Sequence, residues 1–406
     1  MSTGDELAET RLARLALARL AEPGNLAMWT SVNDHGAVRV LQGLLAGDNE
    51  QLLQKGVGAR LAAADPRRRA EASLAHARRL GARVVIPEDG EWPHQLDDLI
   101  TICDRDSTDP IARNAAPPLC LWVRGPWRLD GALSRAVAVV GARGATGYGV
   151  HAAREIGYGL AERDWTAVSG GAFGIDAYAH RGALAAGGIT VAVLACGVDR
   201  AYPVSHAGLF DRVAEEGLLV SEWPPGTDPF RHRFLIRNRV IAAMAGGTVV
   251  VEASARSGAL QTLRRAGQLG RHRMAVPGPI TSSMSVGCHE QLRDPEVHLV
   301  AGVPHILELV GRMGTDLAAP ARGPEHPRDH LGADAQRLLE ALLARKPLSS
   351  EEVAARAGVD VREAMRILPD LAYQGLAQRR GSGYLLSRGR AAPEQGCADG
   401  DRGAAA

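Results

Sequence analysis

Six short apolar runs between residues 137 and 276 constrain the fold of this chain more than any other feature. Each run has three to five residues, and the segments between them are long enough for crossover helices. Runs without alternating polar residues are typical of strands that are buried on both faces, as in a parallel sheet. The sequence therefore predicts an α/β fold with a doubly wound parallel sheet, built on Val137–Val140, Trp165–Val168, Thr190–Leu194, Leu218–Val220, Thr248–Val251 and Met274–Val276.

The segments on either side of this domain have other patterns. Residues 1–110 repeat Leu at helical spacing and predict a helical accessory domain, although a helix-hairpin-helix or similar DNA-contacting module stays open. The α/β domain occupies residues 111–312. A Pro-rich stretch over residues 313–330 is typical of a linker, and residues 388–406 are expected to be a disordered tail.

Residues 331–387 predict a small third domain. Three helical segments are followed by a hairpin over Gln378–Leu386, and this order is similar to a winged helix-turn-helix. Ser349 with Glu352 three residues later predicts a capping box at the start of the second helix. Pro369 lies inside the third helical segment, where it is expected to interrupt the helix. A role in contacting protein or in orienting a dimer is therefore expected at least as much as the reading of duplex DNA.

The cysteines and the apolar runs limit the other classes of protein. The five cysteines have neither metal-ligand nor redox spacing, and their odd number argues against a disulfide framework. No apolar run approaches the roughly 20 residues that cross a membrane, and the first residues do not resemble a signal peptide. We expect a cytoplasmic protein with no membrane contact, no metal and no cofactor.

The distribution of charge is informative although the total is small. With 47 Lys and Arg against 46 Asp and Glu, the net charge of +1 argues at first against a nucleic-acid partner. Only Lys55 and Lys346 are lysines, which a GC-rich coding bias would explain. Residues 231–273, however, hold nine arginines and one acid, a net charge of +8 that leaves −7 elsewhere. Predicted strand ends, where a ligand is expected to bind, fall in this segment. The cluster of arginines is therefore better explained by an extended anionic polymer as the ligand than by a solvated surface.

Two Gly-rich loops connect a predicted strand to a predicted helix. Residues 141–149 combine several glycines with Arg143, and residues 169–180 follow the next strand. Such loops, placed side by side at helix N-termini, would form a floor that binds anions, with a purely structural tight turn as the alternative. The first loop lacks the spacing of G-x-G-x-x-G and the Gly-Lys-Ser/Thr ending of a Walker A motif, so neither a dinucleotide site nor an ATPase is expected.

Other candidates lie near these loops. Asp176 and His180 are four residues apart on one helix, where a loop-holding role is favoured over a catalytic pair. Phe230 and Phe234 lie among the arginines and suit base stacking, although core packing is an alternative for Phe234. A third strand-to-helix loop, residues 252–259, supplies another helix N-terminus.

Five motifs in order resemble the DNA-processing protein A family (DprA/Smf). The family patterns G-[SA]-R-x-x-T-x-Y-G, S-G-x-A-x-G-I-D-x-x-A-H, F-x-x-R-N-R-x-I-A, R-S-G-[SA]-x-x-T and A-V-P-G occur here at residues 141–149, 169–180, 234–242, 256–262 and 275–278. The resemblance covers most of the chain. It departs at Arg233, where the family commonly has Asn, and this change is expected to strengthen DNA binding.

The resemblance implies an extended Rossmann-like domain that binds single-stranded DNA and forms a homodimer. It also implies that the protein loads RecA onto DNA, including DNA coated by single-strand-binding protein, during natural transformation and homologous recombination. No turnover is implied. The DNA-binding residues would be Gly141, Arg143, Thr146, Tyr148, Gly149, Ser169, Gly170, Gly171, Gly174, Arg231, Phe234, Arg237, Asn238, Arg239, Arg256, Ser257 and Gly258.

Two other functions stay open at this stage. One is an enzyme related to the nucleotide phosphoribohydrolases, which share a similar Rossmann core, although their P-G-G-x-G-T-x-x-E signature is absent here. The other is a duplex-DNA binder that acts through the winged-helix-like domain.

Overall fold

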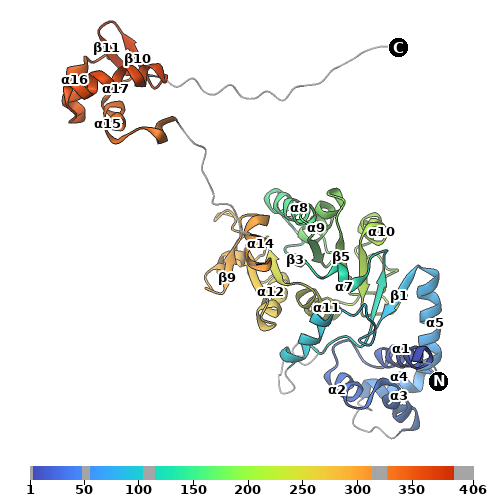
Figure 1. Ribbon diagram of the computed structural model, residues 1–406. Helices are drawn as coiled ribbons and strands as arrows, with labels where there is room; N and C mark the ends of the chain where they lie inside the picture. Colours follow the sequence, from blue (N-terminus) through green and yellow to red (C-terminus); the bar gives the residue numbers. More distant parts are fainter. Residues whose placement is uncertain (1–2, 48–54, 104–114, 313–315, 317–326, 388–406) are drawn as a thin grey trace, which may run out of the picture. The chain divides into compact units, whose positions relative to one another are not determined.

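A mostly parallel sheet with helices on both faces forms the larger of two units in the computed structural model (Figure 1). The structure describes residues 3–47, 55–103, 115–312, 316 and 327–387. Contacts divide the chain into Met1–Ala318 and Ala319–Ala406. Most of the predicted linker and all of the predicted tail lie outside the described residues.

The large sheet has nine strands within the described residues. Their spatial order is β1-β2-β6-β5-β4-β3-β7-β8-β9; β2 is antiparallel to β1 and β6, and all other neighbours are parallel. The α/β prediction is confirmed, and all six predicted strands are present. The strands are β1 (Ala82–Val85), β2 (Leu121–Arg124), β3 (Ala136–Val140), β4 (Thr166–Ser169), β5 (Thr190–Leu194), β6 (Leu218–Ser221), β7 (Gly247–Val250), β8 (His272–Ala275) and β9 (Val297–Leu299).

Helices precede the sheet and connect its strands. The N-terminal helices are α1 (Thr3–Leu20), α2 (Leu26–His35), α3 (Ala37–Ala46), α4 (Lys55–Ala63) and α5 (Pro66–Arg79). Those that follow in the larger unit are η1 (His94–Ile102), α7 (Leu129–Ala132), α8 (Gly147–Ala161), α9 (Ile175–Ala185), η2 (Val204–His206), α10 (Ala207–Glu216), α11 (Arg231–Ala243), α12 (Ala259–Gln268), α13 (Val286–Leu292) and α14 (Val303–Val310).

Both faces of the central strands are buried, which explains their unbroken apolar sequences. On β3, Ala138 and Val140 belong to a core cluster with η1, α11 and α12, whereas Val137 and Val139 belong to another with α8, α9 and α14. A strand whose alternate side chains enter two different cores needs apolar residues at every position.

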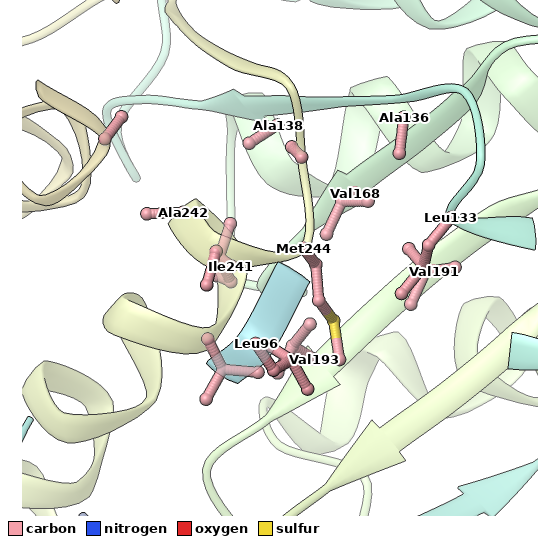
Figure 2. Close-up of a cluster of buried hydrophobic side chains, with 14 of the residues drawn as sticks. Leu96, Leu133, Ala136, Ala138, Val168, Val191, Val193, Ile241, Ala242 and Met244 are labelled. Atoms are coloured by element: carbon pink, nitrogen blue, oxygen red, sulfur yellow. The ribbon is translucent and has the colours of Figure 1, made fainter. Parts of the chain in front are cut away.

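Figure 2 shows part of the first of these clusters. Val168 of β4 and Val193 of β5 lie in it together with Leu96 of η1 and Met244 at the end of α11. This packing fixes α11 against the sheet, and α11 carries four of the nine arginines between residues 231 and 273.

The chain changes direction across the sheet at β3. From β3 it builds β4, β5 and β6 on one side, and it then returns to place β7, β8 and β9 on the other. The loops that leave the carboxyl ends of β3 and β7 therefore diverge to opposite faces. In open α/β sheets such a switch point creates a crevice in which ligands bind.

The N-terminal helices pack onto the β1 end of this sheet. Residues of α1, α3 and α5 share a core cluster with side chains of β1, β2 and β5. Arg14 of α1 donates to Glu88, at 2.7 Å, and Arg11 donates to Asp89. The sequence predicted a mostly helical segment up to residue 110, and β1 also lies in this range and joins the sheet. Arg83 interrupts its apolar residues, so β1 has no unbroken apolar run.

The smaller unit has three helices and a hairpin among its described α and β elements: α15 (Ala333–Ala341), α16 (Ser350–Ala357), α17 (Val361–Tyr373), β10 (Ala377–Arg380) and β11 (Gly383–Leu386). Ser349 and Glu352 form the predicted capping box. The predicted interruption at Pro369 is wrong, because α17 continues through it. Buried Ala364, Leu368 and Leu371 lie on both sides of the proline and hold the helix against its core.

Two kinds of feature are absent from the part of the chain that the structure describes. None of the helices there is both long and apolar enough to span a bilayer. No group of three or more His, Cys, Asp or Glu side chains in the same residues is arranged to hold a metal ion.

The exposed ring of Pro369 provides a test of the packing in the smaller unit. Pro369→Ala restores a backbone N–H donor inside α17 and removes the contact of the proline ring with a carbonyl of the preceding turn. We therefore expect the free energy of unfolding of this unit to rise by about 1–2 kcal/mol. Differential scanning calorimetry of the full chain measures the transition of this unit. An unchanged or lowered transition temperature would show that α17 has already relaxed around the proline.

Candidate functional site

Two adjoining pockets lie where the chain leaves the carboxyl ends of β3, β4 and β5. The switch-point pocket has a volume of about 270 Å³, and the side pocket has about 250 Å³. Both are lined by Arg143, Ala172 and Phe234. The switch-point pocket is also lined by Val140, Gly141, Asp176, Leu235, Arg237, Asn238, Ile241, Ser257, Gly258, Ala259 and Thr262, and the side pocket by Gly170, Phe173, Leu194, Ala195, Cys196, Tyr202, Pro203 and Val204.

Arg143 and Phe234 form the ridge between the two pockets. The Arg143 guanidinium carbon lies 5.7 Å from the centroid of the Phe234 ring, which is a cation–π geometry. Arg143 is exposed, and Phe234 is half-buried against Ala195, Trp223 and Ile236. The ridge therefore offers a charge and a ring to any ligand in either pocket.

The first Gly-rich loop is closed by an acid of the protein itself. The buried Glu252 carboxylate accepts the Thr146 backbone N–H at 2.9 Å and the Thr146 hydroxyl at 2.6 Å. Thr146 is the N-cap of α8 and in turn accepts the Gly149 N–H. The side chain of Glu252 thus occupies the anion position at this helix N-terminus, and the DNA contacts of Thr146 and Gly149 stay a prediction.

The glycines of this loop serve close packing. A Cβ on Gly149 would lie 2.1 Å from the Glu252 carboxylate, and one on Gly141 would lie 2.5 Å from Ile175. Gly141 still lines the switch-point pocket, through its backbone. Tyr148 points elsewhere, since its hydroxyl donates to the Pro277 carbonyl at 2.5 Å. Burial and the charge of Glu252 raise the pKa of Tyr148.

The second loop is held to the sheet by Ser169 and Arg237. Ser169 is buried and donates to the Val139 carbonyl at 2.6 Å. Arg237 donates to the carbonyls of Gly170, at 2.9 Å, and Val193, and only 5% of it is exposed. Burial lowers the pKa of Arg237 to about 10. Ser169 and Arg237 therefore hold the backbone of this loop in place, and Arg237 also adds positive potential to the switch-point pocket, which it lines.

Two glycines let this loop turn beneath the first one. Gly171 and Gly174 have φ values of +86° and +74°, which favour glycine. A Cβ on Gly174 would lie 2.2 Å from the Ala142 carbonyl, and one on Gly171 would press on Phe210. Neither glycine lines the switch-point pocket or the side pocket.

Asp176 and His180 do not form a pair. Asp176 accepts the Ala172 N–H at 3.3 Å at the edge of the switch-point pocket, and burial raises the pKa of its carboxyl against the opposing charge of Arg237. His180 is buried with Nδ1 2.7 Å from the Thr190 hydroxyl, and burial lowers its pKa to about 3. His180 is therefore neutral at physiological pH and lies within the core.

Arg239 does not line the groove as the sequence analysis expected. It is 2% exposed and donates to the buried Glu222 carboxylate at 2.6 Å. Burial raises the pKa of Glu222, and the nearby Arg239 opposes this shift. Both residues are buried, and neither lines the switch-point pocket or the side pocket.

The helix N-terminus that lines this site is that of α12, where the Ser257 hydroxyl accepts the Ala259 N–H at 3.3 Å. Gly258 is its N-cap, Ser257 precedes it, and both line the switch-point pocket. A Cβ on Gly258 would have no neighbour within 4 Å. Asn238 faces the same pocket from α11, whereas Arg231 and Arg256 are exposed and line neither pocket. This pocket thus combines a helix dipole with the charge of Arg143.

The +8 segment is partly neutralised by acids from the rest of the chain. Arg233 pairs with Glu22, Arg239 with Glu222, Arg271 with Asp98, and Arg273 with both Asp294 and Glu296. The charge that remains exposed near the pockets comes from Arg143, Arg231 and Arg256. Counting charges along the sequence overestimated this surface, because the acids that pair with these arginines lie outside the segment.

Several exposed rings around the site were missed by the sequence analysis. Phe173 and Tyr202 line the side pocket with 47% and 46% of their area exposed, and Val204 is 78% exposed beside them. The Tyr202 ring centroid lies 5.4 Å from that of Phe234. Phe173, Tyr202 and Phe234 lie far apart in the sequence, so no local pattern marks them, and only the fold brings these rings together.

The fold and the pockets define a Rossmann-like protein with a ligand site at the switch point of its sheet. The chain belongs to the DNA recombination-mediator protein A family, whose model matches residues 83–311. The family identified from the five motifs is thereby confirmed. The matched range begins in β1 and ends after α14, so it contains both pockets.

Individual relatives agree with this assignment. A putative DNA processing protein DprA of Mycobacterium tuberculosis is 41% identical over 386 residues, which are 93% of this chain and 96% of that protein. DNA processing protein DprA of Streptococcus pneumoniae is 40% identical over 177 residues, 44% of this chain and 62% of that protein. The X-ray structure of the Streptococcus protein has a TM-score of 0.60 at 29% identity, covering 73% of this chain and 96% of that one.

The buried Arg239–Glu222 pair yields a test of its structural role. Arg239→Met leaves the Glu222 carboxylate buried without its partner, so we expect a loss of about 3–5 kcal/mol in the free energy of unfolding. The double variant Arg239→Met with Glu222→Leu removes both charges and should recover most of this loss. Urea unfolding of the full chain measures both, and equal losses in the single and double variants would contradict the pairing.

Proposed function

We propose that this chain binds single-stranded DNA across the two pockets and loads RecA recombinase onto it. The observation that carries the proposal is the ridge of Arg143 and Phe234 between the pockets, at the switch point of the sheet. A guanidinium beside an accessible ring meets a phosphate and a neighbouring base together, and rings stack on any base that is not paired. The family description and the names of the relatives support the link to DNA recombination.

The path of the strand follows the exposed charges. Phosphates would lie against Arg143, Arg231 and the N-terminus of α12, and bases would stack on Phe234 and the rings of the side pocket. Asn238 would donate and accept hydrogen bonds inside the switch-point pocket. Because duplex DNA keeps its base faces covered, this arrangement favours single strands.

The proposal includes no turnover and a homodimer as the working form. Asp176 is engaged with its own loop, and His180 lies in the core, so neither is arranged as a general acid or base. The proposed role is to deliver strands, including those coated by single-strand-binding protein, to RecA in natural transformation and recombination.

Arg143→Ala tests the binding site. Losing one phosphate contact should weaken affinity for a labelled oligothymidine and reduce the slope of log K against log salt by about 0.7. Fluorescence anisotropy over a salt series measures both, with duplex DNA as competitor. Arg154→Ala is the matched control, because Arg154 is exposed on α8 and lines neither pocket. Identical affinity and slope for wild type and Arg143→Ala would refute this site.

Delivery to RecA is tested separately. On single-stranded DNA coated with single-strand-binding protein, the wild-type chain should shorten the lag before RecA hydrolyses ATP, and Arg143→Ala should shorten it less. The reason is that loading requires the chain to hold the strand first. A chain that binds DNA yet leaves the lag unchanged would separate DNA binding from RecA loading and remove the second part of the proposal.

A further inference from the structure

Arg233 is fixed from several directions at the start of α11. Its guanidinium donates to the Glu22 carboxylate at 3.2 Å and to the Asp228 carbonyl at 2.9 Å. The same group lies 4.8 Å from the centroid of the Phe230 ring and 5.6 Å from that of Trp223. Only 12% of the side chain is exposed. Arg233 is therefore unavailable to phosphate in this arrangement, contrary to the expectation from its position in the motif.

Glu22 reaches this arginine from the N-terminal helices. It lies between α1 and α2, and its carboxylate also accepts Arg60 at 3.1 Å and the Trp223 indole N–H at 3.3 Å. Partial burial alone would raise the pKa of Glu22, but hydrogen bonds from Arg233 and Trp223 and the charge of Arg60 bring it below its usual value. The carboxylate is thus ionised and holds three donors at once.

Phe230 is the exposed member of this group. It is the N-cap of α11, and 53% of its area is exposed although Arg233 lies against its ring. Four residues later in the chain stands Phe234, which forms the ridge between the pockets. An exposed phenylalanine that is held by a buried guanidinium is a rigid apolar surface, and rigid rings bind bases at a low entropic cost.

We propose that Glu22 is a positioning residue for DNA binding, which acts through Arg233 to hold Phe230 as a second stacking surface beside Phe234. This inference rests on the proposed function of the pockets. It makes the N-terminal helices part of the DNA-binding site, although they supply no residue that touches the strand. Glu22 and Arg233, which form this contact, are 211 residues apart in the sequence.

The direction in which Glu22→Gln changes the affinity for DNA distinguishes a positioning role from a purely electrostatic one. Removing an acid near a DNA-binding surface should strengthen binding of an anionic strand, and it would also release the charge of Arg233. A positioning role predicts the opposite, because Phe230 loses its support and must be ordered during binding. Glu22→Gln should therefore weaken binding of single-stranded DNA about three- to tenfold, a part of the loss expected when a whole stacking surface is removed.

The experiment measures anisotropy of a labelled oligothymidine with the full chain. Wild type, Glu22→Gln, Phe230→Ala and their double variant form a cycle, in which Glu22→Gln should have no further effect once Phe230 is absent. Glu88→Gln is the matched control: it removes the same charge from a pair with Arg14 of α1, which is not among the contacts of Arg233, and should not weaken binding.

A second readout follows the ring directly. The chain has four phenylalanines, so 4-fluorophenylalanine labelling gives four ¹⁹F signals, and Phe230→Leu assigns the one required. Glu22→Gln should shift and narrow the Phe230 signal as the ring gains mobility, whereas Glu88→Gln should leave it unchanged.

The outcomes distinguish the two proposals. Weaker binding by Glu22→Gln, abolished in the Phe230→Ala background, supports the positioning role. Unchanged or tighter binding by Glu22→Gln, or an additive effect in the double variant, overturns it while the DNA-binding function stands. Failure of the wild-type chain to bind single-stranded DNA overturns the proposed function and this inference together.

Discussion

The contact between Glu252 and Thr146 holds together the part of the sheet on which the site depends. It links the end of β7 to the start of α8 across the switch point, where the chain diverges to opposite faces. The carboxylate satisfies the N-terminus of α8, and the glycine at position 149 leaves room for it. With this helix end closed, the pocket opens toward the N-terminus of α12 instead. An acid within an arginine-rich segment thus decides which of the two helix dipoles a ligand can reach.

The arginines of the chain fall into two groups that local sequence does not separate. Arg237 and Arg239 stand two residues apart on α11, but one binds strand-end carbonyls below the pocket and the other binds a buried acid. Arg143 and Arg231 are exposed. Most of the arginines between residues 231 and 273 strengthen the fold, and the few exposed ones give the site its charge. A near-neutral composition is therefore compatible with exposed arginines around the pockets.

The sequence was sufficient to predict those parts of the fold in which every residue is buried. The six central strands are apolar throughout because both faces are buried, and their positions were correct to within two residues at each end. β1, β2 and β9 were missed: Arg83 and His298 interrupt the apolar runs of β1 and β9, and β2 lies outside the six runs on which the prediction was built. Motif positions located the site, but the roles of Thr146 and Arg239 depend on partners at Glu252 and Glu222, which only the folded chain brings near.

The partners of Glu22 also differ in when they become available during synthesis. Arg60 follows it by 38 residues and Arg233 by 211. At about 5–20 residues per second, the ribosome supplies the first within roughly 2–8 s and the second only after roughly 10–40 s. The N-terminal helices of a nascent chain can thus satisfy this acid locally with Arg60 before α11 exists. The same carboxylate then joins an early-folding segment to a helix made much later, without having been left unpaired in the interval.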